Sequence, residues 1–193
     1  MDENIVANSQ LSRCEWCGED PVYMAYHDNE WGVAVYDDSK LFEMLILEGA
    51  QAGLSWITVL KRREGYREVF DGFDVEACAS YTDQMLLEKL TDARIIRNRL
   101  KVFSVRKNAL AFKAVQASFG SFSHYLWSFV NHTQIVNHNT QLSDLVATSP
   151  LSDAVSKDLK KRGFTFVGST IIYAYLQAVG VIDDHVNTCF KRG

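Results

Sequence analysis

The sequence contains few of the features that mark β-rich, secreted or membrane proteins. It has only two prolines in 193 residues, at Pro21 and Pro150, and no apolar alternation bounded by turns. Without these strand signals, the chain is predicted to be mostly helical. No apolar run approaches the length of a membrane span, and the opening "MDENIVANSQLSR" lacks the basic start and apolar stretch of a signal peptide. We therefore expect a cytoplasmic protein with no membrane partner.

Cysteine and net charge are also low. Four cysteines in a reducing compartment are expected to be thiols or metal ligands rather than disulfides. The net charge of −4 argues against a general polyanion binder, but a nucleic-acid site needs only a local basic patch. No long linker divides the chain, whose hydrophobic content of 47% is enough for a sizeable core. We expect a monomer with a flexible tail at residues 1–13 and a single domain at residues 14–193, formed by two helical lobes around a cleft.

Several segments carry helix start and stop signals. The stretch "SKLFEMLILEGAQA" has helical periodicity from Ser39 to about Ala52, with Asp38 or Ser39 as its cap. "TDQMLLEKL" is predicted to be a short helix capped at Thr82, and "SFSHYLWSFV" another capped at Ser121. A longer helix is predicted from about Asp92 to Gly120, since glycine commonly follows a helix end.

A further pair of helices is joined by a glycine-bearing turn. Ser149 and Pro150 begin the first helix and Gly163 ends it, while Gly168 and Ser169 open the second, which Gly180 ends. Such a turn exposes backbone N–H groups and a helix N-terminus, both of which suit a DNA phosphate. Basic residues precede it at Lys157, Lys160, Lys161 and Arg162. The alternative is an ordinary helix–turn–helix packing without a ligand.

The two ends of the chain carry candidate metal ligands. Cys14 and Cys17 form a C-x2-C pair with His27 after it, and the C-terminal stretch "DDHVNTCFKRG" places His185 and Cys189 four residues apart. On a helix, residues four apart lie on one face, so the last two are predicted to chelate one ion. Cys14, His27, His185 and Cys189 would form a closed structural zinc site that joins the two ends. Cys17 competes with His27 as a ligand, and the alternative is four packed side chains without a metal.

One acidic residue falls on an apolar helix face. Leu41, Met44, Leu45 and Glu48 share a stripe at helical spacing, so Glu48 stands where an aliphatic side chain is expected. A buried acid is costly unless it is hydrogen-bonded or paired, so a cleft with a polar ligand would explain it. The alternative is a glutamate at the edge of the stripe that caps a helix or pairs with an arginine.

Aromatic side chains are frequent around this helix. Aromatic residues are mostly found in protein cores, and Trp31 is expected to be one of those. Several aromatics near one acid also suit a pocket for a flat cationic ring, through stacking and cation–π attraction. Between them, "GAQAGLSW" forms a short loop whose Leu54 is able to press into a base stack. The aromatics concerned are Trp16, Tyr23, Tyr26, Trp31 and Trp56.

These stretches resemble a known family. "DPVYMAYHDNEWG", "LFEMLILEGAQAGLSWITVLKRRE", "LWSFVNH", "LKKRGFTFVGSTIIYAYLQAVG" and "DHVNTC" are similar to the bacterial Tag family of DNA-3-methyladenine glycosylases. The resemblance covers the chain from Cys14 to Cys189. It implies the all-α fold of the helix-hairpin-helix DNA glycosylase superfamily, with "KRGFTFVGST" as the hairpin. It also implies a DNA repair enzyme that releases 3-methyladenine from alkylated double-stranded DNA.

The resemblance assigns roles residue by residue. It implies one structural zinc, a base pocket with a catalytic glutamate, a DNA-wedging loop and a DNA-binding hairpin. The zinc ligands would be Cys14, His27, His185 and Cys189. The pocket would contain Glu48, Tyr26 and Trp56, with Trp16 and Tyr23 nearby. The loop would contribute Gln51, Gly53 and Leu54, and the hairpin Gly163, Val167, Gly168 and Ser169.

Two departures from the wider superfamily bear on the chemistry. Gly168 is followed by Ser169 and not by the lysine that many members use as a nucleophile, so the resemblance implies a hydrolase without strand-cleaving lyase activity. A catalytic aspartate often follows the hairpin, but Asp183 and Asp184 adjoin His185 and are not expected to fill that role. The alternatives are a glycosylase for another damaged base and a non-catalytic helix-hairpin-helix DNA-binding module.

Overall fold

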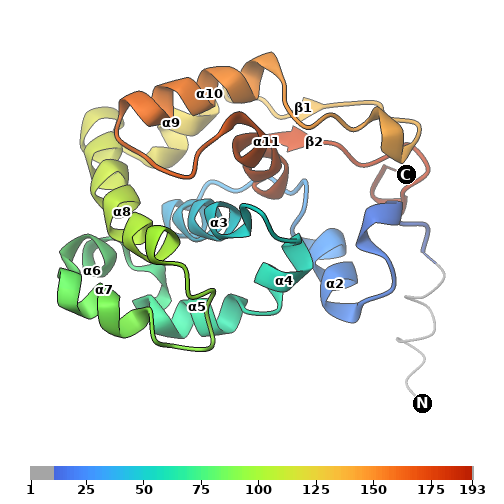
Figure 1. Cartoon of the computed structure of the whole chain (residues 1–193). Helices are drawn as coiled ribbons and strands as arrows, with labels where there is room; N and C mark the ends of the chain where they lie inside the picture. The colour runs from blue at the N-terminus through green and yellow to red at the C-terminus, as the bar shows by residue number, and fades with distance from the viewer. Residues whose placement is uncertain (1–10, 193) are drawn as a thin grey trace.

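The structure is a computed structural model that describes residues 11–192, and it is mostly helical, as predicted (Figure 1). The N-terminal half contains short helices around one long one. In chain order they are η1 (Glu15–Cys17), α2 (Pro21–Asn29), α3 (Asp38–Gln51), α4 (Trp56–Leu60), α5 (Arg63–Val69), η2 (Asp71–Phe73), α6 (Val75–Ser80) and α7 (Asp83–Lys89).

The C-terminal half adds the longest helix and two very short strands. It consists of α8 (Arg99–Phe119), α9 (Phe122–Ser128), β1 (Ile135–Val136), η3 (Leu142–Asp144), α10 (Pro150–Lys161), α11 (Ser169–Ala178), β2 (Ile182–Asp183) and η4 (Phe190–Arg192). No helix in the described part of the chain is long and apolar enough to cross a membrane.

Helix α3 lies in the middle of the molecule, with α4, α8, α9 and α11 packed around it (Figure 1). All its residues from Leu41 to Ala50 are buried. Asp37 caps it by accepting a hydrogen bond from the backbone N–H of Lys40, so the predicted cap at Asp38 or Ser39 is wrong. Asp38 instead accepts from the backbone N–H groups of Phe122 and Ser123 and thereby joins α9 to α3.

The other predicted helix starts are confirmed except one. Thr82, Ser121 and Ser149 each accept a hydrogen bond from the third residue of the helix that follows. The long helix α8 begins at Arg99, not at about Asp92 as predicted. The Asp92 carboxylate accepts from the backbone and side chain of Arg94, and such local bonding competes with helix formation.

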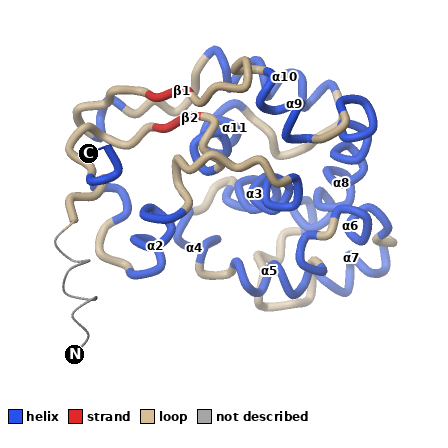
Figure 2. The backbone as a smooth tube through the Cα atoms, turned by 180° about the vertical axis from the view of Figure 1, so that it is seen from behind, coloured by secondary structure: helices blue, strands red, loops and turns tan. Residues whose placement is uncertain are grey.

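The two ends of the described chain lie side by side. β1 and β2 pair in parallel near the C-terminal end (Figure 2), and the Phe190 N–H donates to the carbonyl of Ser12 at 2.7 Å. The segment from His185 to Cys189 is a bridge and turn after β2, so the predicted helix there is wrong. Of the predicted tail, residues 1–10 lie outside the described residues, and Arg13 makes an ion pair with Asp28 at 2.8 Å.

Candidate active site and metal centre

A cavity of about 200 Å³ opens beside the C-terminal half of α3. Its walls come from η1, α2, α3, α4, α11 and the segment around η3, so it depends on parts of the chain that are distant in sequence. The lining residues are Trp16, Tyr23, Tyr26, Trp31, Glu48, Gln51, Trp56, Leu142, Leu145, Ala174 and Gln177. The structure therefore brings all the predicted pocket residues to one cavity.

Glu48 provides the acidic group of this cavity. The residue is 3% exposed, and its Oε2 has no hydrogen-bond partner among the described residues. Burial away from water disfavours the ionised form and raises the pKa of Glu48 to about 8. Burial of a carboxylate without a partner costs free energy. A ligand that supplies hydrogen-bond donors or positive charge would therefore be favoured beside Glu48.

Aromatic rings form the walls beside this carboxylate. The Tyr26 and Trp56 ring centroids lie 5.4 Å apart, and those of Trp16 and Tyr26 lie 6.4 Å apart. The Nε1 donors of Trp16 and Trp56 are buried and have no hydrogen-bond partner within residues 11–192. The cavity thus combines flat apolar walls with two unused donors and one unused acceptor, a combination that suits a planar, polar-edged ligand.

Sequence reasoning missed part of this wall. Trp31 is buried in the core, as expected, but it also lines the cavity, with its ring centroid 4.9 Å from that of Trp16. Ala174 and Gln177 reach the cavity from α11, where their spacing of three places them on one helix face. Leu142 begins the short helix η3 and Leu145 follows its end, and no local pattern could have found them.

Of the predicted wedging residues, Gln51 lines the same cavity, and Gly53 and Leu54 follow it in the chain. Gln51 is the last residue of α3 and lines the cavity. Gly53 has a φ of +77°, a backbone conformation that favours glycine, and Leu54 after it is 40% exposed. The loop of residues 51–54 therefore presents an apolar side chain to solvent next to the cavity.

The predicted hairpin joins α10 to α11 as a tight turn. Gly163 has a φ of +95°, and Gly168 is the N-cap of α11. Val167 is 2% exposed, and its carbonyl accepts a hydrogen bond from the Ser156 hydroxyl at 2.6 Å. The Ser169 hydroxyl lies 2.8 Å from that of Ser152, which fixes the first turn of α11 against α10.

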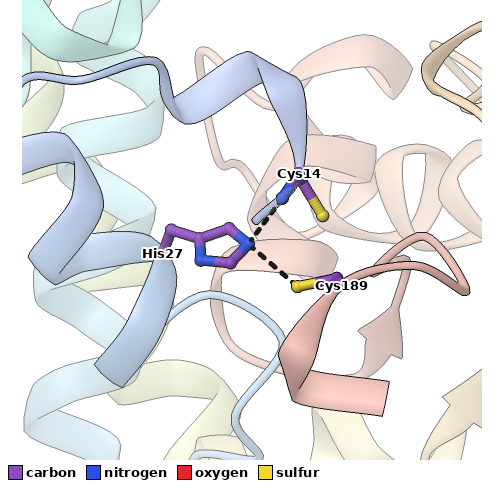
Figure 3. A group of neighbouring side chains, drawn as sticks. All are labelled: Cys14, His27 and Cys189. Carbon is purple, nitrogen blue, oxygen red and sulfur yellow. Dashed lines mark hydrogen bonds between the residues drawn. The ribbon is translucent and has the colours of Figure 1, made fainter. Parts of the chain in front are cut away.

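Three of the predicted metal ligands converge where the chain ends meet (Figure 3). Ligand atoms of Cys14, His27 and Cys189 all lie within 4.8 Å of one another, and all three residues are buried. The Nε2 of His27 lies 3.5 Å from the sulfur of Cys189, and its Nδ1 lies 2.8 Å from a carboxylate oxygen of Asp28. Thiol and imidazole ligands in this closed, buried arrangement suit zinc.

His185 and Cys17 differ in their relation to this group. His185 is not one of the three clustered ligands, but its ring centroid lies 5.0 Å from that of His27, and its buried Nε2 has no partner among the described residues. Its Nδ1 lies 2.6 Å from the carboxylate of Asp183. Cys17 is buried outside the cluster, with its thiol directed at the carbonyl of Gly18. Of the C-x2-C pair, Cys14 therefore belongs to the cluster and Cys17 does not.

The aspartates near the chain end are occupied by structural bonds. Asp184 is 1% exposed and accepts from the side chains of Asn137, Asn139, Tyr173 and Gln177. Asp183 is bonded to His185 and pairs with Arg192. Neither carboxylate lines the cavity, in agreement with the expectation that they do not act as the catalytic acid or base.

Known proteins share both sequence and fold with this chain. The methyladenine glycosylase family model matches residues 16–192. DNA-3-methyladenine glycosylase 1 of Escherichia coli (strain K12) is 49% identical over 179 residues, or 93% of this chain and 96% of that protein. DNA-3-methyladenine glycosylase of Haemophilus influenzae is 47% identical over 178 residues, or 92% of this chain and 96% of that protein.

Solved structures agree with the sequence matches. A crystal structure of 3-methyladenine DNA glycosylase I has a TM-score of 0.92 at 46% identity, covering 94% of this chain and 100% of that one. A Staphylococcus aureus structure that concerns 3-methyladenine recognition has a TM-score of 0.92 at 36% identity, covering 95% and 97%. The chain belongs to the methyladenine glycosylase family.

Proposed function

We propose that this protein is a monofunctional DNA glycosylase that releases 3-methyladenine from alkylated DNA and leaves an abasic site. The observation that carries the proposal is the buried carboxylate of Glu48 in a cavity with aromatic walls, because its Oε2 has no hydrogen-bond partner in the described part of the chain. Relatives with nearly half of their residues identical are named DNA-3-methyladenine glycosylases. Ser169 stands where a lyase would need a lysine, so no Schiff base is expected.

The lesion base is a cation, and this property fits the cavity. A positive ring next to Glu48 favours the ionised carboxylate, which otherwise stays largely protonated at neutral pH because burial raises its pKa to about 8. Glu48 then accepts hydrogen bonds from the amino edge of the base. Tyr26 and Trp56 stack on the ring or orient it, and Trp16 and Tyr23 complete the wall. A neutral base gains less from the carboxylate, and this difference provides selectivity.

The bond that breaks is the glycosidic bond of a base that is already a good leaving group. Its electron pair goes to the departing base, which leaves neutral, and the sugar acquires oxocarbenium character. A water adds its oxygen to the sugar carbon and loses a proton to solvent. The main task of the protein is then to extrude the nucleotide and bind the correct base.

The rim of the cavity and the hairpin would hold the DNA. In the proposal, Gln51, Gly53 and Leu54 enter the base stack, with Leu54 as the apolar wedge. Gly163, Val167, Gly168 and Ser169 contact a phosphate through backbone N–H groups and the N-terminus of the ten-residue helix α11. The two groups of helices on either side of α3 would form the two lobes of a single domain, with double-stranded DNA between them.

A structural zinc would be bound by Cys14, His27, His185 and Cys189. The proposal is supported by the three clustered ligands and by the buried Nε2 of His185, which has no hydrogen-bond partner in the part of the chain that the structure describes. In both histidines Nδ1 contacts a carboxylate, of Asp28 and Asp183, which is the usual arrangement when Nε2 binds a metal. Bound there, the ion would stabilise the fold and keep Trp16, Tyr23 and Tyr26 next to Glu48.

Chromatography of the bases released from methylated duplex DNA tests the proposal. We expect 3-methyladenine in the released fraction and intact strands, because an abasic site remains without lyase cleavage. Release of a different modified base would favour a glycosylase of other specificity. Binding to DNA without any base release would favour a helix-hairpin-helix binding module. The monomeric state and the cytoplasmic location stay predictions.

A further inference from the structure

The C-terminal end of α3 is held by a side chain from a distant helix. The ammonium group of Lys101 donates to the backbone carbonyls of Ala50 at 2.8 Å and Ala52 at 2.7 Å. The last carbonyls of a helix have no partner within the helix, and they lie at the negative end of its dipole. A lysine ammonium therefore satisfies both the hydrogen-bonding need and the charge at this end.

The position of Lys101 is fixed by its own helix. It is the third residue of α8, and its backbone N–H donates to the side chain of Asn98, the N-cap, at 3.1 Å. Among the described residues, no carboxylate lies within ion-pair distance of its ammonium group. Partial burial lowers the pKa of Lys101. Its charge is therefore directed to the two carbonyls and not to a surface acid.

These two carbonyls flank the proposed DNA-wedging loop. Ala50 precedes Gln51 and Ala52 follows it, and the other hydrogen bonds of residues 50–54 are local, such as that from Leu54 N–H to the carbonyl of Gln51. Within residues 11–192, Lys101 makes the only hydrogen bonds that tie residues 50–54 to a distant part of the chain. Without Lys101, no hydrogen bond from a distant part of the described chain would hold the loop that carries the exposed Leu54.

We propose that Lys101 is a positioning residue that holds the loop of residues 51–54 in the geometry needed to enter the base stack. The inference rests on the proposed function, in which this loop acts as a wedge. A wedge must resist the restoring force of the stacked duplex, so a loosened loop loses part of the stabilisation of the extruded state. In single-stranded DNA no opposite strand has to be displaced, so the same loosening costs little.

The test compares Lys101→Met with Lys107→Met on duplex and single-stranded oligonucleotides that carry 3-methyladenine. Lys107 is an exposed lysine of the same helix without an ion pair among the described residues, and it provides the matched control. We expect Lys101→Met to reduce single-turnover base release from the duplex about tenfold, the effect of losing one charged hydrogen bond. Release from the single strand should change less than about twofold. Lys107→Met should leave both rates unchanged.

Binding of free 3-methyladenine, followed by tryptophan fluorescence, separates positioning from damage to the cavity. Lys101→Met should bind the free base as the unchanged protein does, and Lys101→Arg should recover most of the duplex activity. If Lys101→Met does not fold, Lys101→Gln provides the neutral variant for the same comparison.

If Lys101→Met lost base release equally on duplex and single-stranded DNA, or lost none on the duplex, the proposed role of Lys101 would be wrong. If the unchanged protein released no 3-methyladenine from either substrate, the proposed function would fail, and the role of Lys101 with it.

Discussion

Two glutamates on α3 are both buried, but their surroundings differ. Glu43 is 8% exposed, and its carboxylate is bonded to Arg63 and to Arg67, while Arg63 also binds Glu30. Glu48 lies five residues further along the helix and is 3% exposed, and one of its carboxylate oxygens has no partner among residues 11–192. The first acid is compensated inside the protein and serves the fold. The second has no such compensation among the described residues, as expected of a group that binds a ligand, and burial alone does not distinguish the two.

The metal centre shows the same difference between paired and unpaired groups. Nδ1 of His185 contacts Asp183, whereas its buried Nε2 has no partner among the described residues. The unpaired atom next to three clustered ligands supports its role as the fourth ligand of a zinc. Unpaired buried polar atoms therefore point to two different ligands in this molecule, an ion and a base.

The largest effect on stability is expected at the metal centre. Cys189→Ser removes a ligand, so zinc content should fall well below one ion per chain, and the free energy of unfolding should fall by an amount on the order of 5 kcal/mol. Cys17→Ser, at the buried neighbour outside the cluster, should retain the zinc. Elemental analysis and urea denaturation measure both. A full complement of zinc in the Cys189 variant would show that the ligand set is wrong.

A smaller loss of stability is expected at the compensated glutamate. Glu43→Gln leaves Arg63, which is 7% exposed, with only Glu30 as an ionised partner. Breaking a buried ion pair from one side costs about 3 kcal/mol. Urea denaturation at pH 7 should therefore detect a clear decrease, and stability equal to that of the unchanged protein would mean that Glu43 is not held as described.

At Glu48, in contrast, a substitution is expected to increase the free energy of unfolding. Its pKa is raised from 4.5 to about 8, so between these pH values the folded protein holds a proton that the unfolded chain releases. Stability should therefore fall as pH rises through this range. Glu48→Gln removes the titration, so it should be more stable than the unchanged protein by about 4 kcal/mol at pH 8 and by less than about 0.5 kcal/mol at pH 4.5. Parallel stability curves for the two proteins would contradict the burial of an unpaired acid.

The sequence predicted those features that depend on neighbouring residues. The stripe with Leu41 and Met44 placed Glu48 on a buried face, and Thr82 and Ser149 were correctly identified as caps because capping involves residues three apart. The predicted start of α8 was wrong because the Asp92 carboxylate bonds locally to Arg94. Glu43 lies off the stripe, and its burial depends on Arg63, twenty residues away, which no local pattern reveals.

Site features that depend on tertiary packing were harder to predict. Lys101 lies about fifty residues from the end of α3 in the sequence, and only the fold brings the two together. His185 and Cys189 were expected on a helix, but a turn places Cys189 near His27 instead. The clustering of Cys14, His27 and Cys189 was thus anticipated from ligand types and from the family resemblance, although the local geometry behind the prediction was wrong.

The most direct test of the account compares base release by Glu48→Gln and Glu43→Gln from the same methylated duplex, under conditions where both variants are folded. The account predicts that Glu48→Gln loses release of 3-methyladenine by about a hundredfold, because the charge that favours the cationic base is gone. Glu43→Gln removes an equal charge from the same helix and should keep most of the base release. Equal activity of the two variants would contradict the assignment of Glu48 as the group that binds the base.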